Sequence, residues 1–176
     1  MTAKPGRNRN SAQRRSAARL AAVQALYEIE LTGSPVDRVL DDFLTHKIGA
    51  KTLIAAPEDE DAEVEAILAP PDRIMFAAIV RGTTARLEDF DAMVNGALTN
   101  DWTVERLEAV LRCIMRAGAF ELATRADVPP RVAISEYVDV AHAFFSGPEP
   151  KMVNAVLDRI AKVVRSEEIG GDVGER

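Results

Sequence analysis

Apolar side chains near the start of the chain recur at three- and four-residue spacing, which is typical of one face of a helix: Leu20, Val23, Tyr27 and Leu31. The pattern stops at Gly33 and Pro35, residue types that end helices through their backbone preferences. Upstream, Ser11 is a residue type whose hydroxyl caps helix N-termini. The sequence therefore predicts a first helix over about residues 12–31, starting at or near Ser11.

The same helical spacing returns along most of the remaining chain. The pattern is strongest over residues 107–122, where Arg112 and Arg116 lie off the apolar face. Prolines and glycines separate the segments. In chain order, the pattern predicts further helices over residues 36–46, 71–99 (two helices, or one bent at 82–84), 107–122, 131–145 and 149–165. We therefore expect an all-α fold of about seven helices.

Three stretches lack this pattern. Residues 48–71 hold prolines, a glycine and an acidic cluster, so we interpret them as an excursion with room for one short helical turn near residues 62–68. Residues 1–10 are polar and contain Pro5 and Gly6, which predicts a disordered basic arm, and the glycine-containing residues 166–176 predict a flexible tail. The helical domain is thus expected over residues 11–165.

Composition agrees with a single helical domain and excludes several classes of protein. Hydrophobic residues make up 47% of the 176 residues but aromatic residues only 5%, a mixture that suits close helix packing. No apolar run approaches the roughly 18 to 20 residues that span a membrane, and the N-terminus has charged residues where a signal peptide would be apolar. We therefore expect a cytoplasmic protein with no membrane association.

Metal and catalytic chemistry have no basis in the sequence. Cys113 is the only cysteine, and His46 and His142 stand far apart, so no set of residues has zinc-ligand spacing. A glycine-rich phosphate loop, a nucleophile elbow and a paired-histidine motif are all missing from the sequence. We therefore expect no metal, no cofactor and no enzymatic activity.

The charge of the chain is unevenly distributed. The total is −6, yet residues 1–19 carry six basic residues and no acid, so the remainder carries −12. These six residues are Lys4, Arg7, Arg9, Arg14, Arg15 and Arg19. A basic N-terminal segment therefore precedes an acidic body.

Four segments, in order, resemble the NusB family of antitermination proteins. RLAAVQALY over residues 19–27 is similar to that family's N-terminal signature, and residues 109–122 to its central helix. DVPPRVAISE over residues 127–136 and KMVNAVLD over residues 151–158 follow. The chain is identified as a member of this family over about residues 14–162. Among the departures, Met152 stands where relatives often have Phe, and Ser135 and Ala155 replace the commoner Asn and Gly.

The resemblance implies both a fold and a function. The implied fold has two packed three-helix subdomains and an extra helix. The implied function is transcription antitermination, through binding of boxA RNA in ribosomal leader transcripts together with the ribosomal protein NusE, in a complex with NusA, NusG and RNA polymerase. The alternative is a helical protein-interaction adaptor in ribosome assembly with little RNA affinity of its own. Both a monomer and a homodimer remain open.

The candidate RNA contacts are mostly arginines, because a guanidinium bridges phosphate oxygens and stacks on unpaired bases. Arg14, Arg15 and Arg19 are the leading candidates, since Arg15 and Arg19 lie one helical turn apart. Lys151 and Met152 match family positions close to RNA. Weaker candidates are Lys4, Arg7, Arg9, Gln24 and Tyr27.

Each of these residues also has a structural interpretation. A basic N-terminal segment can simply increase the solubility of a protein. Lys151 could be an ordinary solvated surface residue, and Met152 could pack against neighbouring apolar side chains. For Tyr27, the apolar pattern around it favours core packing over a role beneath a base. Glu121 falls close to the apolar side of its helix, so we expect a structural ion pair with an arginine or a bond to a backbone donor.

Overall fold

The computed structural model describes residues 5–48, 52–55, 63–66 and 70–170. In chain order its elements are α1 (Pro5–Thr32), α2 (Val36–Asp42), the π-helical η1 (Phe43–Lys47), β1 (Thr52–Ala55), β2 (Glu63–Ala66), α3 (Arg73–Ala85), α4 (Leu87–Ala97), the short 3-10 helix η2 (Val104–Arg106), α5 (Ala109–Thr124), α6 (Pro130–Phe144), α7 (Glu149–Val164) and α8 (Ser166–Gly170). The predicted all-α class is confirmed, and in the described residues the two short strands pair only with each other. Among these residues no helix has the length and apolarity needed to cross a membrane.

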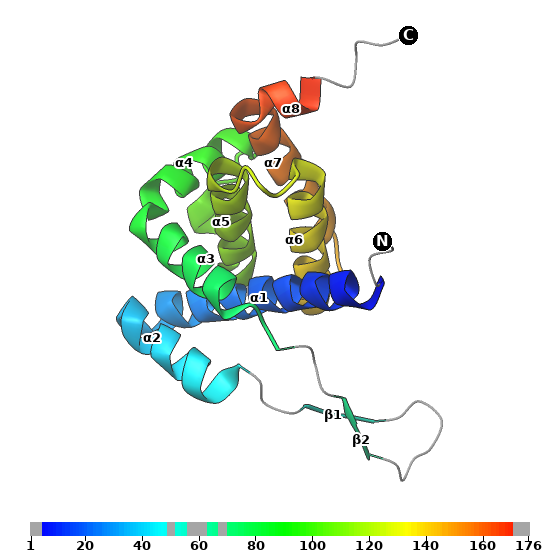
Figure 1. Cartoon of the computed structure of the whole chain (residues 1–176). Helices are drawn as coiled ribbons and strands as arrows, with labels where there is room; N and C mark the ends of the chain where they lie inside the picture. The colour runs from blue at the N-terminus through cyan, green and yellow to red at the C-terminus, as the bar shows by residue number, and fades with distance from the viewer. Residues whose placement is uncertain (1–4, 49–51, 56–62, 67–69, 171–176) are drawn as a thin grey trace.

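Helix α1 is the spine on which two groups of helices meet (Figure 1). Helices α2 and α3 pack against it to form one three-helix group, and α5, α6 and α7 pack together into a second. Helix α4 is the additional helix, in contact with α5 and α7, and α1 also contacts α5 and α6. The expected arrangement of two three-helix subdomains and an extra helix is therefore confirmed.

The buried face of α1 is made largely of alanines, which lets other helices approach its backbone closely. Ala18, Ala22 and Ala25 are fully buried, together with Val23. Leu31, which the predicted pattern placed inside, is 61% exposed. The buried face of α1 is therefore turned around the helix axis relative to the predicted face. The prediction counted only large apolar residues, whereas close helix packing favours small ones.

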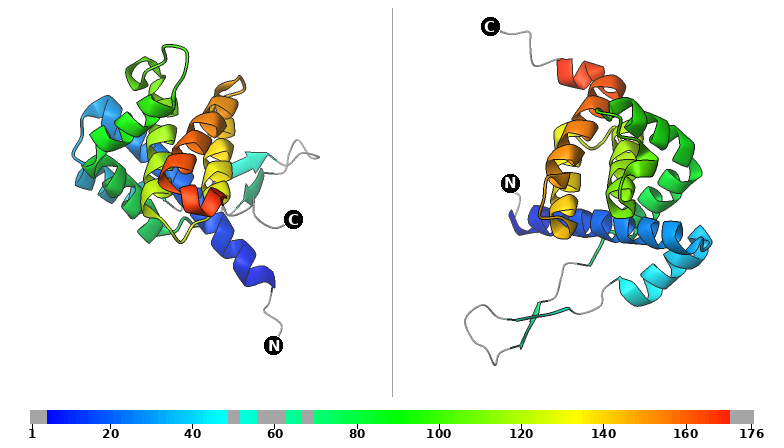
Figure 2. Two further views of the ribbon diagram at one scale, coloured as in Figure 1. Left: turned by 90° about the horizontal axis from the view of Figure 1, so that it is seen from above. Right: turned by 180° about the vertical axis from the view of Figure 1, so that it is seen from behind.

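Helix α1 begins at Pro5, not near Ser11, so the predicted disordered arm over residues 1–10 is corrected for residues 5–10. Proline suits the first turn of a helix, where its missing N–H costs no hydrogen bond. Beyond it, the helix continues on its own backbone hydrogen bonds, and its N-terminal end extends past the other helices (Figure 2). Residues 1–4 lie outside the described residues.

The excursion contains strands where a helical turn was expected. β1 and β2 pair antiparallel, with Thr52 opposite Ala66 and Ala55 opposite Glu63. The predicted turn near residues 62–68 is therefore wrong for 63–66, while 62, 67 and 68 lie outside the described residues. The physical reason is the pairing itself, because a partner strand supplies backbone hydrogen bonds that a short isolated helix lacks.

The C-terminal boundary also lies further along the chain than expected. The side chain of Arg165 is almost buried and donates hydrogen bonds to the carbonyls of Val128 (2.7 Å) and Arg125 (3.2 and 3.3 Å). It thereby ties the end of α7 to the loop after α5. Helix α8 follows directly, so the predicted flexible tail is corrected for residues 166–170, and residues 171–176 lie outside the described part.

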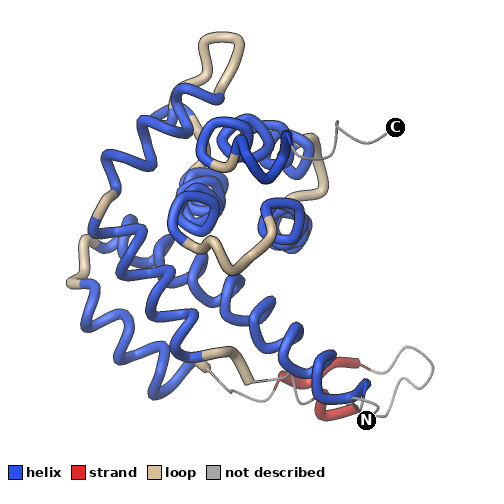
Figure 3. The backbone as a smooth tube through the Cα atoms, turned by 45° about the horizontal axis from the view of Figure 1, so that its top comes forward, coloured by secondary structure: helices blue, strands red, loops and turns tan. Residues whose placement is uncertain are grey.

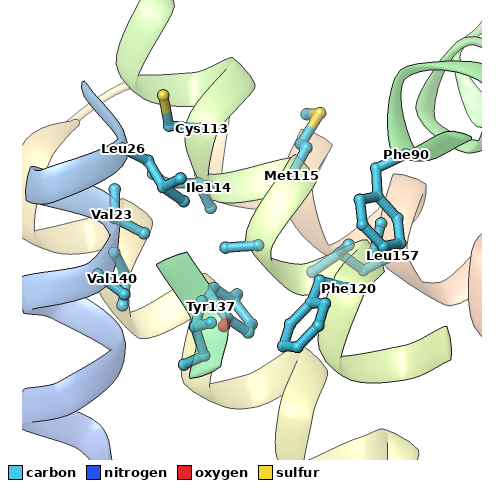
Figure 4. Close-up of a cluster of buried hydrophobic side chains, with 14 of the residues drawn as sticks. Val23, Leu26, Phe90, Cys113, Ile114, Met115, Phe120, Tyr137, Val140 and Leu157 are labelled. Atoms are coloured by element: carbon cyan, nitrogen blue, oxygen red, sulfur yellow. The ribbon is translucent and has the colours of Figure 1, made fainter. Parts of the chain in front are cut away.

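The centre of the core is α5, whose side chains meet residues of α4 and α7 (Figure 4). Phe90 and Phe120 meet edge to face with ring centroids 6.0 Å apart. On its other side, Phe120 occupies the space that a side chain at Gly82 would need, with ring atoms 2.1–2.8 Å from an ideal Cβ. Gly82 is therefore a helical residue of α3 that allows Phe120 to approach closely. Helix α3 ends later, and Arg86 separates it from α4, so residues 71–99 contain two helices.

Substituting Gly82 should test this close approach. We expect Gly82→Ala to lower the free energy of unfolding by about 1–3 kcal/mol, because the added methyl group displaces the Phe120 ring. Gly96→Ala is the matched control, since no atom lies within 4 Å of its Cβ position and alanine favours a helix by up to about 1 kcal/mol. Urea unfolding of both variants measures the difference, and equal stabilities would contradict the proposed contact.

Candidate nucleic-acid interface

Arg14 lies on the exposed side of α1, where it meets the chain returning from the excursion. Its Nε donates a hydrogen bond to the carbonyl of Pro70 at 3.1 Å. Its own carbonyl accepts one from the backbone N–H of Asp72 at 2.9 Å, and Asp72 caps α3 by accepting from Met75. The start of α3 thus holds Arg14 in place while the guanidinium's remaining N–H groups stay available to a ligand.

Among the side chains that the structure describes, Arg9 and Arg15 are the other exposed arginines on this half of α1. Arg15 donates from Nη1 to the hydroxyl of Ser11 at 2.9 Å, one turn earlier in the helix. In the described part of the chain, neither residue nor Arg14 has a carboxylate partner. The first acidic residue of α1 is Glu28, near its other end, so this half carries an unneutralised positive charge.

Arg19 has a different place from the one expected. Its side chain is only 3% exposed, and its Nε and Nη2 donate to the two carboxylate oxygens of Glu121 at 2.8 and 2.9 Å. Its Nη1 lies 3.1 Å from Glu136 on α6. The prediction that Arg19 contacts RNA is therefore corrected, because every terminal nitrogen of this guanidinium is committed inside the protein.

The expected ion pair of Glu121 is confirmed, and Arg19 is its partner. Burial lowers the pKa of Arg19, but the hydrogen bonds and charge of Glu121 outweigh this effect and raise that pKa, so the side chain stays cationic. Tyr137 lies fully buried beside the pair, and burial, followed by the charge of Glu121, raises its pKa well above the ordinary value. The cluster ties α1 to α5 and α6 at one point.

A groove of about 600 Å³ runs between α1 and α6, and Arg9 is the exposed arginine that lines it. Its lining is apolar at Ala12, Ala17, Leu20, Val140 and Ala143, and polar at Arg9, Gln13, Ser16, Glu136 and Asp139. Glu136 is engaged, since it accepts a hydrogen bond from the Ser16 hydroxyl at 2.6 Å and pairs with Arg19. Asp139 is exposed.

The structure does not bring Lys151 and Met152 to this groove. They lie in the first turn of α7, one of the helices drawn in blue in Figure 3, which packs against α5 and α6. Lys151 is exposed and Met152 half-buried. Both remain predictions as RNA contacts, and neither lines the groove.

The weaker candidates divide in the same way. Gln24 is exposed on α1, and Tyr27 packs partly buried against the core, as its apolar neighbours indicated. Lys4 lies outside the described residues, and Arg7 is described only as part of the α1 backbone. Sequence reasoning missed the groove, because Asp139 and Gln13 lie on helices whose contact cannot be seen in a single-helix pattern.

The chain matches the model of the NusB family over residues 16–162. It is 48% identical over 165 residues to the transcription antitermination protein NusB of Rhodospirillum rubrum, covering 91% of this chain and 89% of that protein. It is 44% identical over 157 residues to the protein of the same name from Rhizobium rhizogenes, covering 89% and 91%.

Solved structures give the same answer for the fold. The structure of T. maritima NusB matches with a TM-score of 0.67 at 25% identity, covering 88% of this chain and 96% of that one. A second structure contains the antitermination factors NusB and NusE in complex with double-stranded RNA, and matches with a TM-score of 0.64 at 21% identity, covering 84% and 96%. At that identity the likeness concerns the fold alone.

Removing one partner of the buried pair should destabilise the protein. We expect Glu121→Ala to lower the free energy of unfolding by about 3–5 kcal/mol, because it leaves the buried Arg19 charge with only Glu136 nearby. The double variant Arg19→Met/Glu121→Leu should recover most of this loss, since it buries no charge at the site. Glu88→Ala, at an exposed position on α4, should change stability by less than about 0.5 kcal/mol. Wild-type stability of Glu121→Ala in thermal and urea unfolding would refute the structural role.

Proposed function

The chain belongs to the NusB family, and on that premise we propose that it is a transcription antitermination factor. In this proposal it binds boxA RNA of ribosomal leader transcripts together with the ribosomal protein NusE. The resulting complex assembles with NusA, NusG and RNA polymerase.

The observation that carries the proposal is the state of the exposed arginines on α1. Arg9, Arg14 and Arg15 lie on one half of a single helix and, in the described part of the chain, have no carboxylate partner. Unneutralised arginines on an otherwise acidic protein suit the phosphates of a single strand, and guanidinium planes also stack on unpaired bases.

The buried arginine supports this role indirectly. Arg19 fixes α1 against α5 and α6 through Glu121 and Glu136. The exposed arginines are therefore presented from a rigid helix, which reduces the conformational entropy lost when RNA binds. In this role Arg19 is a positioning residue.

The acidic body suits a basic partner. Outside residues 1–19 the chain carries −12, and complementary charge steers the encounter with a basic ribosomal protein. The same charge limits RNA affinity in the absence of a partner, so NusE would supply much of the useful affinity. Lys151 and Met152, on α7, would contact RNA at a second point.

The arginine variant tests the proposal. We expect Arg14→Ala/Arg15→Ala to weaken binding of boxA RNA by about tenfold or more, because two charge-assisted contacts are lost. The slope of log affinity against log salt should fall by about 0.7 for each lost phosphate contact. Fluorescence anisotropy with boxA RNA and a scrambled RNA, with and without NusE, measures both quantities.

Arg38→Ala/Arg81→Ala is the matched control, because it removes the same charge from exposed positions on α2 and α3. It should bind boxA RNA within about twofold of wild type, apart from long-range charge effects. Equal, weak binding of both RNAs by wild type and by the Arg14/Arg15 variant would instead favour the adaptor function.

A further inference from the structure

We propose that the groove between α1 and α6 receives one unpaired base of the bound RNA, and that the carboxylate of Asp139 selects guanine there. The inference rests on the proposed function, since it needs an RNA strand on the arginines of α1. It adds a residue that specifies the sequence to a surface whose arginines bind phosphates and stack on bases without distinguishing among them.

The shape and lining of the groove suit a flat ring with a polar edge. Its volume of about 600 Å³ lies within the range of ordinary ligand clefts, roughly 300–1,000 Å³. Ala17, Leu20 and Val140 offer apolar surface to a ring, while Gln13 and Asp139 supply polar groups. Such a lining takes up an unstacked base more readily than a hydrated phosphate.

Two carboxylates line the groove, and they differ in how far they are engaged. Glu136 is half-buried, and its Oε2 is held by the Ser16 hydroxyl at 2.6 Å and by Arg19 at 3.1 Å. Asp139 is exposed and has no hydrogen bond or ion pair within the part of the chain that the structure describes. Its two oxygens can therefore accept hydrogen bonds from a ligand.

Among the four bases, guanine fits a carboxylate best. Its Watson–Crick edge presents N1–H and N2–H side by side, and the two oxygens of Asp139 can accept one hydrogen bond from each. Adenine, cytosine and uracil each place an acceptor beside their donor, and a carboxylate repels an acceptor. A bidentate contact of this kind discriminates by about tenfold or more.

The distribution of charge indicates where the backbone of the strand lies. The carboxylates of Glu136 and Asp139 repel phosphates from the groove, whereas Arg14 and Arg15 attract them to the exposed side of α1. Arg9 lies at the groove itself and can pair with the phosphate of the inserted nucleotide. The backbone therefore follows α1, and one base turns inward.

Competition binding tests the inference. Unlabelled oligouridine strands with a single central guanine, inosine or adenine displace labelled boxA RNA from the full-length protein at low salt. We expect the guanine strand to compete about tenfold better than the adenine strand, with inosine between them because it lacks the N2 amino group. Asp139→Asn should remove this preference, since an amide places a donor against one of the guanine donors. Asp41→Asn, the same change at an exposed position on α2, should keep it.

The outcomes separate the inference from the proposed function. A guanine preference that survives in Asp139→Asn, or its absence in wild type, overturns the inference even when binding still depends on Arg14 and Arg15. If Arg14→Ala/Arg15→Ala binds boxA RNA as tightly as wild type, the proposed function fails. A guanine preference that depends on Asp139 but not on Asp41 supports the inference, and circular dichroism confirms that each variant is folded.

Discussion

The buried contact of Arg19 with Glu121 determines how the two halves of this molecule are joined. Two charges are removed from water at that point, and only their paired hydrogen bonds, with Glu136 as a further partner, offset the cost. An apolar contact tolerates sliding of one helix along another, but a bidentate pair has one geometry. The alanine face of α1 brings the backbones close, and the pair then fixes the position of α1 along α5 and α6.

As a consequence, the arginines of α1 have two different roles. Arg19 faces the core, whereas Arg14 and Arg15, five and four residues earlier, face solvent and keep donors available. A second charged cluster, in which Arg112 and Arg116 meet Glu30 and Asp91, holds the other end of α1 against α5 and α4. With α1 fixed at both clusters, the exposed arginines have little freedom except in their own side chains.

The sequence predicted the helices well where large apolar residues repeat, as over α5 and α7, because that periodicity is the burial pattern itself. It failed where the deciding contact is distant in sequence. Nothing in the sequence was a reason to treat Arg19 differently from Arg15, because both are arginines of one helix. Only the fold places Glu121, about a hundred residues later, against Arg19. The strands over residues 52–55 and 63–66 form because they pair with each other. The groove beside Asp139 likewise forms only where α1 meets α6.

The acidic groove beside a basic helix has a physical logic for a protein that must choose among RNAs. Arginines alone bind any polyanion, so added positive charge raises affinity for correct and incorrect strands alike. A carboxylate at Asp139 lowers affinity for every strand that inserts no suitable donor. Discrimination thus comes from the negative charge of Asp139, whose repulsion is offset only by a base that donates two hydrogen bonds to it. The overall charge of −6 increases this discrimination by keeping nonspecific RNA binding weak. Affinity lost in this way can be restored by a basic partner without loss of selectivity, because the partner's contribution need not distinguish among bases.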